Sequence, residues 1–366
     1  MTKAAELAKW GEVSTNGQVS GRRNIIINGA MKVAQRSTSV TGIGGSNGYF
    51  TVDRFYIGKG DTAGRLTMTQ TADGPSGFAN CIKLDCTTAD TSVAAGELLW
   101  LEQKIEGQDL QQFKKGTSDA EQYSVSFYVK GNANATYALA LHDTDNSRHI
   151  VKLFSVTTAW TRITMTFPAD TTGAFNDDNA HSLSVRIWLH AGSTYTSGTL
   201  QSSAWAGLTA ANRAAGITSF FDSTDRTFFL TGLQLEVGSV ATPFEHRSFG
   251  EELVLCQRYC HRINSNGSDD IPIGTGFYNA STTCRVMVTV PTTMRAASTF
   301  TTLDSGLDIL RDSSSDTSIT LDAAIDQSRH GCILNFTGAA STTAGEGVIL
   351  RLGTEAANFI EFDAEL

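Results

Sequence analysis

Proline, charge and long apolar runs are all scarce in this chain of 366 residues. Only 18% of the residues are charged, and no stretch approaches the ~20 consecutive apolar residues of a membrane span, so we expect no membrane insertion. The 28 Lys and Arg residues are outnumbered by 37 Asp and Glu residues, which leaves a net charge of -9. That sign disfavours nucleic-acid binding, because neutralising phosphates over a broad surface needs an excess of cations.

Cysteine is also sparse. Six cysteines are too few for a disulfide scaffold in a chain of this length, and no two of them have the CxxC spacing. We therefore expect free thiols in a protein made in the cytoplasm. Cys81 and Cys86 are an odd number of residues apart on one predicted strand, so they should point to opposite faces and not bond to each other. The N-terminus lacks the apolar run of about 7–15 residues that marks a secretory signal.

Glycine is abundant, with 34 residues against 5 prolines, in a background rich in Thr and Ser. This composition is typical of many tight turns between short strands. From residue 24 onward apolar residues recur at every second position, as in Leu183, Val185, Ile187 and Leu189, which is the period of a half-buried strand. No helical connection of the length that a parallel crossover needs is evident. The sequence thus predicts an all-β fold, an antiparallel jelly-roll sandwich.

Three regions follow from the pattern. Residues 1–23 carry a short helical signal that is marginal alone, so Leu7 and Trp10 are predicted to anchor it on a partner surface, with a disordered tail as the alternative. Residues 24–248 form the sandwich. Residues 249–366 form a short helix and a second, smaller β domain, because Ser248 and Glu251 have the spacing of a capping box. We expect that helix to run from Glu252 to Arg262.

Three blocks of the sequence carry a resemblance: Asn24–Arg36 with Tyr49–Phe55, Gly232–Arg247, and Glu252–Tyr259. They resemble the opening, the closing strand and the following helix of tail fibers and fiber-like virion appendages of tailed phages. Ser126–Lys130, Trp160 and the ending Phe359–Leu366 are also similar to that group. The resemblance covers roughly residues 24–262 and leaves residues 1–23 outside.

The resemblance implies a carbohydrate-binding-module-like jelly roll in a homotrimeric appendage of the virion, made in the host cytoplasm. It implies attachment to a bacterial surface, where we expect the receptor to be a glycan. Residues 1–23 lie outside the resemblance, and we predict from their marginal helix that they dock to other tail proteins. Two alternatives stay open: a capsid or collar decoration without a receptor, and a tailspike-like polysaccharide depolymerase. The motif residues can also be explained by structural roles rather than ligand contacts: Asn28-Gly29 suits a turn, and Glu245 is predicted to pair with Arg247.

Catalytic patterns are absent from the sequence: it has no GxSxG elbow and no HExxH spacing. Cys256, Cys260 and His261 on the predicted helix supply at most two ligands, whereas structural zinc takes four. Paired carboxylates lie in predicted turns. The first interpretation is that these Asp residues stabilise the turns, the second is that they bind Ca²⁺, and the third is that they cleave a glycan. These pairs are Asp143 with Asp145 and Asp177 with Asp178. We expect no catalytic residue, metal or cofactor.

Glycan binding would use aromatic rings that stack on sugars. Tyr128 and Trp188 lie on the parity of their strands opposite the aliphatic face, which should meet solvent or a neighbouring subunit. Trp100 is a further candidate. Trp205 belongs to a long irregular stretch near residues 195–215, where it serves either as a packing plug or in binding. The candidates for glycan binding or a subunit interface are Trp100, Tyr128, Trp188 and Trp205.

Overall fold

A computed structural model of the chain describes residues 3, 22–303, 306–311, 314–316, 319–338 and 342–366. The predicted docking residues Leu7 and Trp10 lie outside this part. The chain divides into two compact units. Unit 1 comprises Met1–Glu252 with Leu366, and unit 2 comprises Leu253–Glu365.

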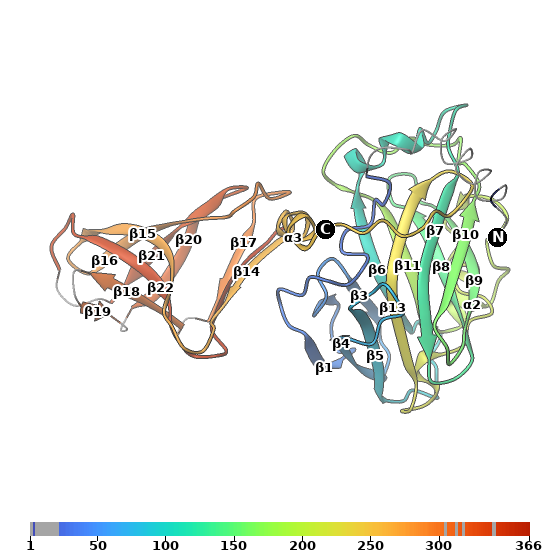
Figure 1. The fold of residues 1–366 in the computed structure, drawn as a ribbon, viewed down its shortest axis with the longest axis horizontal. Helices are drawn as coiled ribbons and strands as arrows, with labels where there is room; N and C mark the ends of the chain where they lie inside the picture. The colour runs from blue at the N-terminus through green and yellow to red at the C-terminus, as the bar shows by residue number, and fades with distance from the viewer. Residues whose placement is uncertain (1–2, 4–21, 304–305, 312–313, 317–318, 339–341) are drawn as a thin grey trace. The chain divides into compact units, whose positions relative to one another are not determined.

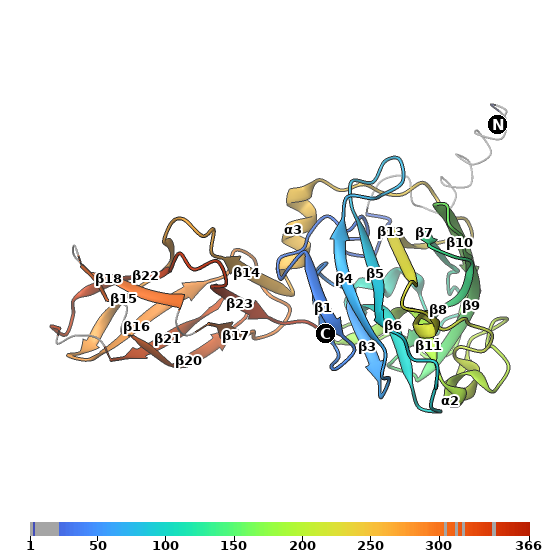
Figure 2. The ribbon, with the colours of Figure 1, turned by 90° about the horizontal axis from the view of Figure 1, so that it is seen from below.

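Unit 1 is built from two antiparallel sheets, which Figure 2 shows as separate layers. In sheet order, the six-stranded sheet contains β1 (Ser39–Ile43), β4 (Arg65–Thr71), β5 (Cys81–Thr88), β13 (Thr227–Val237), β7 (Tyr123–Gly131) and β10 (Thr161–Phe167). The seven-stranded sheet contains β12 (Ala206–Gly207), β9 (Arg148–Val156), β8 (Ala135–Asp143), β11 (His181–Ala191), β6 (Leu98–Glu106), β3 (Tyr56–Gly60) and β2 (Gly48–Tyr49). Figure 1 shows several of these strands side by side. The predicted all-β, antiparallel sandwich is confirmed.

The main core lies between these two sheets and is formed by alternate residues of each strand. Val125 and Phe127 of β7 face Leu139 and Leu141 of β8 across the interior, and all four side chains are fully buried. Burial of one such side chain contributes about 1.5–3 kcal/mol, which makes this layer the main source of stability. Truncating Phe127 to alanine would cost about 3–5 kcal/mol, because a cavity would remain.

Residues of the opening and closing motifs bind one another. The Asn24 side chain accepts hydrogen bonds from the backbone of Ile26 (3.0 Å) and Leu235 (3.1 Å). Glu245 accepts one from the Asn24 backbone at 2.8 Å. Arg247 donates to the Ile26 carbonyl at 3.0 Å and lies 3.8 Å from the Glu245 carboxylate. The motifs therefore close the sandwich where the chain enters and leaves it.

The turn at Asn28 and Gly29 is more specific than the sequence suggested. The residue with the left-handed conformation is Asn28, at φ 60°, and its side chain donates to the Val33 carbonyl at 2.8 Å. Gly29 is needed for a different reason: a β-carbon there would lie 2.1 Å from the Leu233 carbonyl oxygen. The close approach of two backbones excludes any other residue.

Short helical segments connect the strands of unit 1. These are η1 (Gly107–Asp109), η2 (Gln111–Phe113), α2 (Ser193–Thr196), η3 (Ala210–Asn212) and η4 (Phe220–Asp222). All six cysteines are buried thiols. Burial raises the pKa of Cys81 and of Cys86 to about 11, so neither thiol is ionised near neutral pH. No helix in the described residues combines the length and hydrophobicity of a membrane span.

The helix α3 (Phe249–Gln257) begins at the predicted capping box. The backbone N–H of Ser248 donates to Glu251 at 2.9 Å, and the backbone N–H of Glu251 donates to the Ser248 hydroxyl at 3.3 Å. The predicted extension to Arg262 is wrong. Residues from Cys260 onward form β14 (Cys260–Asn264), because they pair with β23 (Phe359–Asp363) about a hundred residues later.

Unit 2 contains a three-stranded and a seven-stranded antiparallel sheet. The first has the order β14, β23 and β17 (Thr299–Thr302). The second has the order β19 (Ser314–Asp316), β18 (Leu307–Arg311), β22 (Gly347–Leu352), β15 (Ile271–Ala280), β16 (Thr283–Thr289), β21 (Gly331–Thr337) and β20 (Thr320–Ser328). The second β region expected after residue 249 is present. Strand β15 escaped prediction because Pro272 and two glycines interrupt its pattern.

Candidate functional site

The face of the seven-stranded sheet of unit 1 that points away from the main core carries two of the aromatic candidates. Trp188 on β11 lies directly opposite Trp100 on β6, and the ring centroids are 4.9 Å apart. Two residues along β11, Arg186 lies opposite Glu102. Alternation places all four on this outer face, since Val185 and Ile187 point into the main core.

Trp100 is half-buried, and its ring lies over β3. Gly58 is its cross-strand partner there, and a β-carbon on Gly58 would come within 2.2 Å of the indole nitrogen. That nitrogen donates to a Glu102 carboxylate oxygen at 2.9 Å. The hydrogen bond to Glu102 and the lack of a side chain on Gly58 together fix the orientation of the Trp100 ring.

Trp188 is not exposed, contrary to the prediction. The segment 193–217 folds over this part of the sheet and forms a second small core with it, so the Trp188 side chain is 0% exposed. Ala138 and Ala140 on the neighbouring strand leave the room that this segment fills. The strand parity of Trp188 is as expected, but the overlying segment removes it from solvent. The long irregular stretch is an ordered cover.

Two guanidinium groups lie beside the tryptophans. Arg186 pairs with Glu102 at 2.9 Å, and its Cζ lies 4.7 Å from the Trp100 ring centroid. Arg213, which follows η3, has its Cζ 4.8 Å from the Trp188 ring centroid. Although burial raises it, the pKa of Glu102 is lowered overall by Arg186 and by the Ser184 hydroxyl. The Glu102 carboxylate is therefore ionised, and its negative charge balances the positive charge of Arg186.

Three histidines occupy the next rows of the same sheet. His142 and His149 are cross-strand partners, and His181 bonds to the Ser184 hydroxyl at 2.8 Å. Burial lowers the pKa of His142 to about 3, with help from Arg186 and Arg213. Burial likewise lowers the pKa of His149 and of His181 to about 4 each. All three imidazoles are neutral at pH 7.

The other two aromatic candidates lie elsewhere. Tyr128 is half-buried on the outer face of the six-stranded sheet, where its ring centroid is 5.1 Å from that of Phe78. Trp205 is 7% exposed, belongs to the main core, and donates from its indole nitrogen to the Pro168 carbonyl at 2.9 Å. Its position is that of a packing plug. The structure brings together Trp100 and Trp188 but not Tyr128 or Trp205.

Three of the four predicted turn carboxylates, Asp143, Asp145 and Asp178, have protein partners. Asp143 pairs with Lys115 at 2.7 Å, and the same ammonium lies 3.2 Å from Asp170. Lys115 also donates to the carbonyls of Thr172 (2.8 Å) and Gly173 (2.6 Å). The Lys115 ammonium is thus surrounded by two carboxylates and two backbone carbonyl oxygens, and it balances the negative charge of Asp143.

One group of described residues has the composition of a metal site. The ligand atoms of Asp90, Glu97 and His190 lie within 4.8 Å of one another, and all three residues are buried. Each already has protein partners: Thr62 donates to Asp90 at 2.8 Å, His190 lies 3.2 Å from Glu97, and its other ring nitrogen lies 2.7 Å from the Ser219 hydroxyl. These contacts describe a hydrogen-bond network that is complete without an ion.

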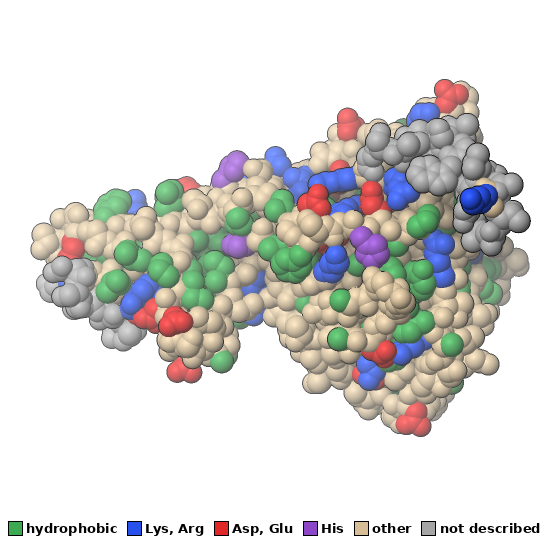
Figure 3. All heavy atoms as spheres, in the orientation of Figure 1, with side chains coloured by type: hydrophobic (Ala, Val, Ile, Leu, Met, Phe, Trp, Pro, Cys, Tyr) green, Lys and Arg blue, Asp and Glu red, His purple; other side chains and the backbone are tan. Residues whose placement is uncertain are grey.

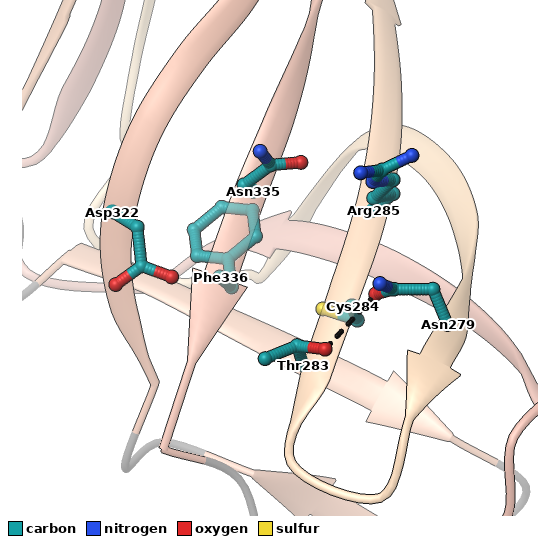
Figure 4. Close-up of a pocket in the computed structure, with 7 residues that line it drawn as sticks. All are labelled: Asn279, Thr283, Cys284, Arg285, Asp322, Asn335 and Phe336. Carbon is teal, nitrogen blue, oxygen red and sulfur yellow. Dashed lines mark hydrogen bonds between the residues drawn. The ribbon is translucent and has the colours of Figure 1, made fainter.

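A small cavity lies on the seven-stranded sheet of unit 2 (Figure 4). Its volume is about 170 Å³, below the ~300–1,000 Å³ of typical ligand pockets. Asp322, Asn335 and Arg285 line it from three neighbouring strands, and Thr283 donates to Asn279 at 3.1 Å. The cavity holds at most a small polar group.

A row of uncharged residues, all apolar except Thr275, crosses the same sheet on the face away from the unit 2 core. Each member is the cross-strand partner of the next, and Met287 at 60% and Ile349 at 38% are strongly exposed. We call this set the apolar row: Leu310, Ile349, Thr275, Met287, Ile333 and Ile325. Hydrophobic side chains are visible at the surface over β15, β16 and β22 (Figure 3). Such surface is typical of association.

Sequence reasoning missed the charged half of the outer face. A signal for Arg186 and Glu102 existed, since each is two residues from a tryptophan and shares its parity. No such signal existed for Arg213, which belongs to a segment without periodicity. The role of Gly58 could be recognised only from the pairing of β3 with β6, which places it opposite Trp100.

No protein-family model and no curated protein matches the chain. Among solved structures, a carbohydrate-binding module of the CBM4 type is similar at 11% identity and a TM-score of 0.30, over 57% of this chain and 97% of that one. TmCBM61, solved with β-1,4-galactotriose, is similar at 9% identity and a TM-score of 0.31, over 59% and 99%. The enzymatically active domain of bacteriophage CBA120 tailspike protein 4 is similar at 12% identity and a TM-score of 0.31, over 60% of this chain and 22% of that one.

Proposed function

We propose that this chain is a structural protein of a phage virion, a trimeric tail fiber or fiber-like appendage that attaches to a bacterial surface glycan. The observation that carries the glycan part is the outer face at Trp100. It combines a half-buried indole with a carboxylate and two guanidinium groups on one side of a rigid sheet. Aromatic rings stack on sugars, and ionic side chains hydrogen-bond to hydroxyl groups.

The virion part is supported by the motif residues. Asn24, Glu245 and Arg247 of the tail-fiber-like blocks bind one another at the closure of the sandwich. They are therefore explained as determinants of this fold rather than as ligand contacts. Deleting residues 1–23 should leave a folded protein that no longer enters virions, and retained incorporation would refute docking through this segment.

The trimer part is supported by the apolar row of unit 2. We assign this face to contacts between copies of this chain, because its members carry no charge and charged residues are depleted at the centre of interfaces. Light scattering on the purified protein should give three times the chain mass of 39.2 kDa. A monomer at micromolar concentration contradicts the trimer.

An array of bacterial surface polysaccharides tests attachment. The full-length protein should bind at least one glycan, and Trp100→Ala should weaken that binding at least tenfold while the fold is retained. Phe78→Ala is the matched control, since it removes a half-buried ring that lies beside the other sheet and is not a binding candidate. Wild-type protein that binds no glycan, or equal binding by Trp100→Ala, contradicts the proposal and favours a decoration without a receptor.

The proposal assigns no catalysis to the chain. Incubation with a bound polysaccharide should release no reducing ends. Release of reducing sugar by the purified protein would instead identify a depolymerase, and substitution of Asp177 and Asp178 would then show whether that pair of turn carboxylates is responsible.

A further inference from the structure

Arg213 differs from three other arginines of unit 1, each of which has a carboxylate partner. Arg148 is paired with Asp170 at 2.8 Å, Arg186 with Glu102 at 2.9 Å, and Arg247 with Glu252 at 3.3 Å. Within the described part of the chain, no group accepts a hydrogen bond from the Arg213 guanidinium and no carboxylate pairs with it. Its five N–H donors are therefore left for another acceptor.

Aromatic rings surround this guanidinium. Its Cζ lies 4.8 Å from the ring centroid of Trp188, 5.7 Å from that of Tyr195 and 5.9 Å from that of Trp100. Tyr195 and Trp100 are half-buried, as is Arg213 itself, so this group of side chains reaches the surface. Cation–π contacts stabilise a charge here but leave the in-plane N–H groups unused.

The surroundings of Arg213 carry an excess of positive charge. Glu102 is the nearby carboxylate, and Arg186 already occupies it. Burial, together with repulsion by Arg186, lowers the pKa of Arg213 to about 10, so the group stays charged at neutral pH without a counterion. An unmatched charge at a half-buried position is costly, and its retention points to a ligand that supplies the opposite charge.

We propose that Arg213 binds the carboxylate of an acidic saccharide whose sugar ring lies against Trp100 and Tyr195. The inference rests on the proposed glycan attachment and specifies its chemical class. A planar guanidinium holds a carboxylate through two parallel hydrogen bonds, a geometry that a neutral sugar cannot use. Neutral polysaccharides would leave the charge of Arg213 unmatched.

The test uses the full-length protein and four polyanionic glycans: polygalacturonate, alginate, hyaluronan and polysialic acid. Carboxyl-reduced polygalacturonate, which keeps the sugar ring and loses the charge, is the matched neutral probe. We expect binding to at least one acidic polymer, at least tenfold weaker binding to its carboxyl-reduced form, and weakening at 0.5 M NaCl because ions screen the pair.

Two substitutions assign the effect to one residue. Arg213→Met removes the charge and should reduce acidic-glycan binding at least tenfold. Arg213→Lys keeps the charge without the two-pronged geometry and should give an intermediate loss, which also covers the case in which Arg213→Met does not fold. Lys83→Met is the control, since Lys83 lies 5.7 Å from the Phe229 ring on the other sheet.

The outcomes separate the two proposals. Binding to neutral glycans on the array, with none to the four acidic polymers, overturns the inference and leaves glycan attachment standing. Equal binding of an acidic polymer by wild type and both Arg213 variants also overturns it. Failure to bind any glycan contradicts the proposed function itself. Phosphorylated or sulfated polymers that bind where all carboxylated ones fail would refute the carboxylate assignment.

Discussion

The indole ring of Trp100 occupies the space that a side chain on Gly58 would need. A β-carbon at Gly58 would lie 2.2 Å from the ring nitrogen, so the tryptophan and the glycine are coupled across β6 and β3. The orientation of Trp100 in the proposed glycan-binding face thus depends on a residue that has no side chain.

Gly58→Ala should displace the Trp100 ring. We expect a loss of glycan binding of at least tenfold and a fall in the free energy of unfolding of about 1–3 kcal/mol, the usual cost of overpacking. Glycan binding and chemical denaturation measure the two effects. Gly207→Ala is the control, since nothing lies within 4 Å of its added β-carbon. Unchanged binding by Gly58→Ala would show that the ring orientation does not matter.

Two adjacent lysines should differ greatly in their effect on stability. The Lys115 side chain is 0% exposed and pairs with Asp143, whereas that of Lys114 is 54% exposed and pairs with Glu121. Lys115→Met removes the cation that pairs with the buried Asp143 carboxylate, while Asp170 keeps Arg148, and should cost about 3–5 kcal/mol of unfolding free energy. Lys114→Met should change it by less than about 1 kcal/mol. Urea denaturation compares them, and equal values would contradict the internal ion-pair network.

Unit 1 should lose stability in mild acid. The folded-state pKa values of His142, His149 and His181 are about 3, 4 and 4, below the ordinary histidine value of 6.5. The unfolded chain therefore binds more protons than the folded one as pH falls from about 6.5 towards 4. Each such histidine lowers the unfolding free energy by up to about 1.4 kcal/mol per pH unit in that range.

Thermal unfolding between pH 7 and pH 4.5 measures this loss. His149→Phe should flatten the dependence, because His149 is 2% exposed and neither ring nitrogen has a partner among the described residues. A melting temperature that stays constant over this range would show that these imidazoles are not held neutral.

Met287→Glu should dissociate the proposed trimer. Met287 lies within the apolar row and is 60% exposed in the single chain, so three carboxylates would enter the assembled interface. Light scattering should then give a monomer mass with an unchanged circular dichroism spectrum. Val93→Glu, at a residue of unit 1 that is 41% exposed, is the control and should remain trimeric. A trimeric Met287→Glu protein would place the interface elsewhere.

Metal ions should not affect the melting temperature. Asp90, Glu97 and His190 have the separation of ligands, but Thr62 and Ser219 already complete their hydrogen bonds. We expect the same unfolding midpoint with EDTA and with added Zn²⁺ or Ca²⁺. A midpoint that rises with metal, and returns to its original value in the Asp90→Asn variant, would identify a metal site here.

The sandwich could be predicted because its strands keep a strict period of two. Alternation alone separated Ile187 from Trp188 and assigned them to opposite faces. Elements that depend on distant partners could not be found this way. The run after Glu252 has no helix breaker, yet Cys260 joins a sheet because β23 lies beside it. Tertiary pairing overrides local preference there.

The candidate site was predictable only in part. Strand parity predicted the outer-face position of Trp188, whereas Trp100 was a candidate without a parity argument. The 193–217 segment that covers Trp188 could not be predicted, since an irregular loop has no periodic pattern. Arg213 came from that segment. The feature that defines it, a charge without a partner, exists only in three dimensions and has no trace in the residue order.

The hydrogen bond from the Asn24 backbone to the Glu245 carboxylate has a mechanical consequence. It brings the two ends of a sandwich of more than two hundred residues to one spot, 2.8 Å apart at the bonded atoms. A force applied along the chain would act on this hydrogen bond before it acted on the two sheets. In the proposed appendage, such a force on the particle would not deform the face at Trp100 to which we assign the glycan.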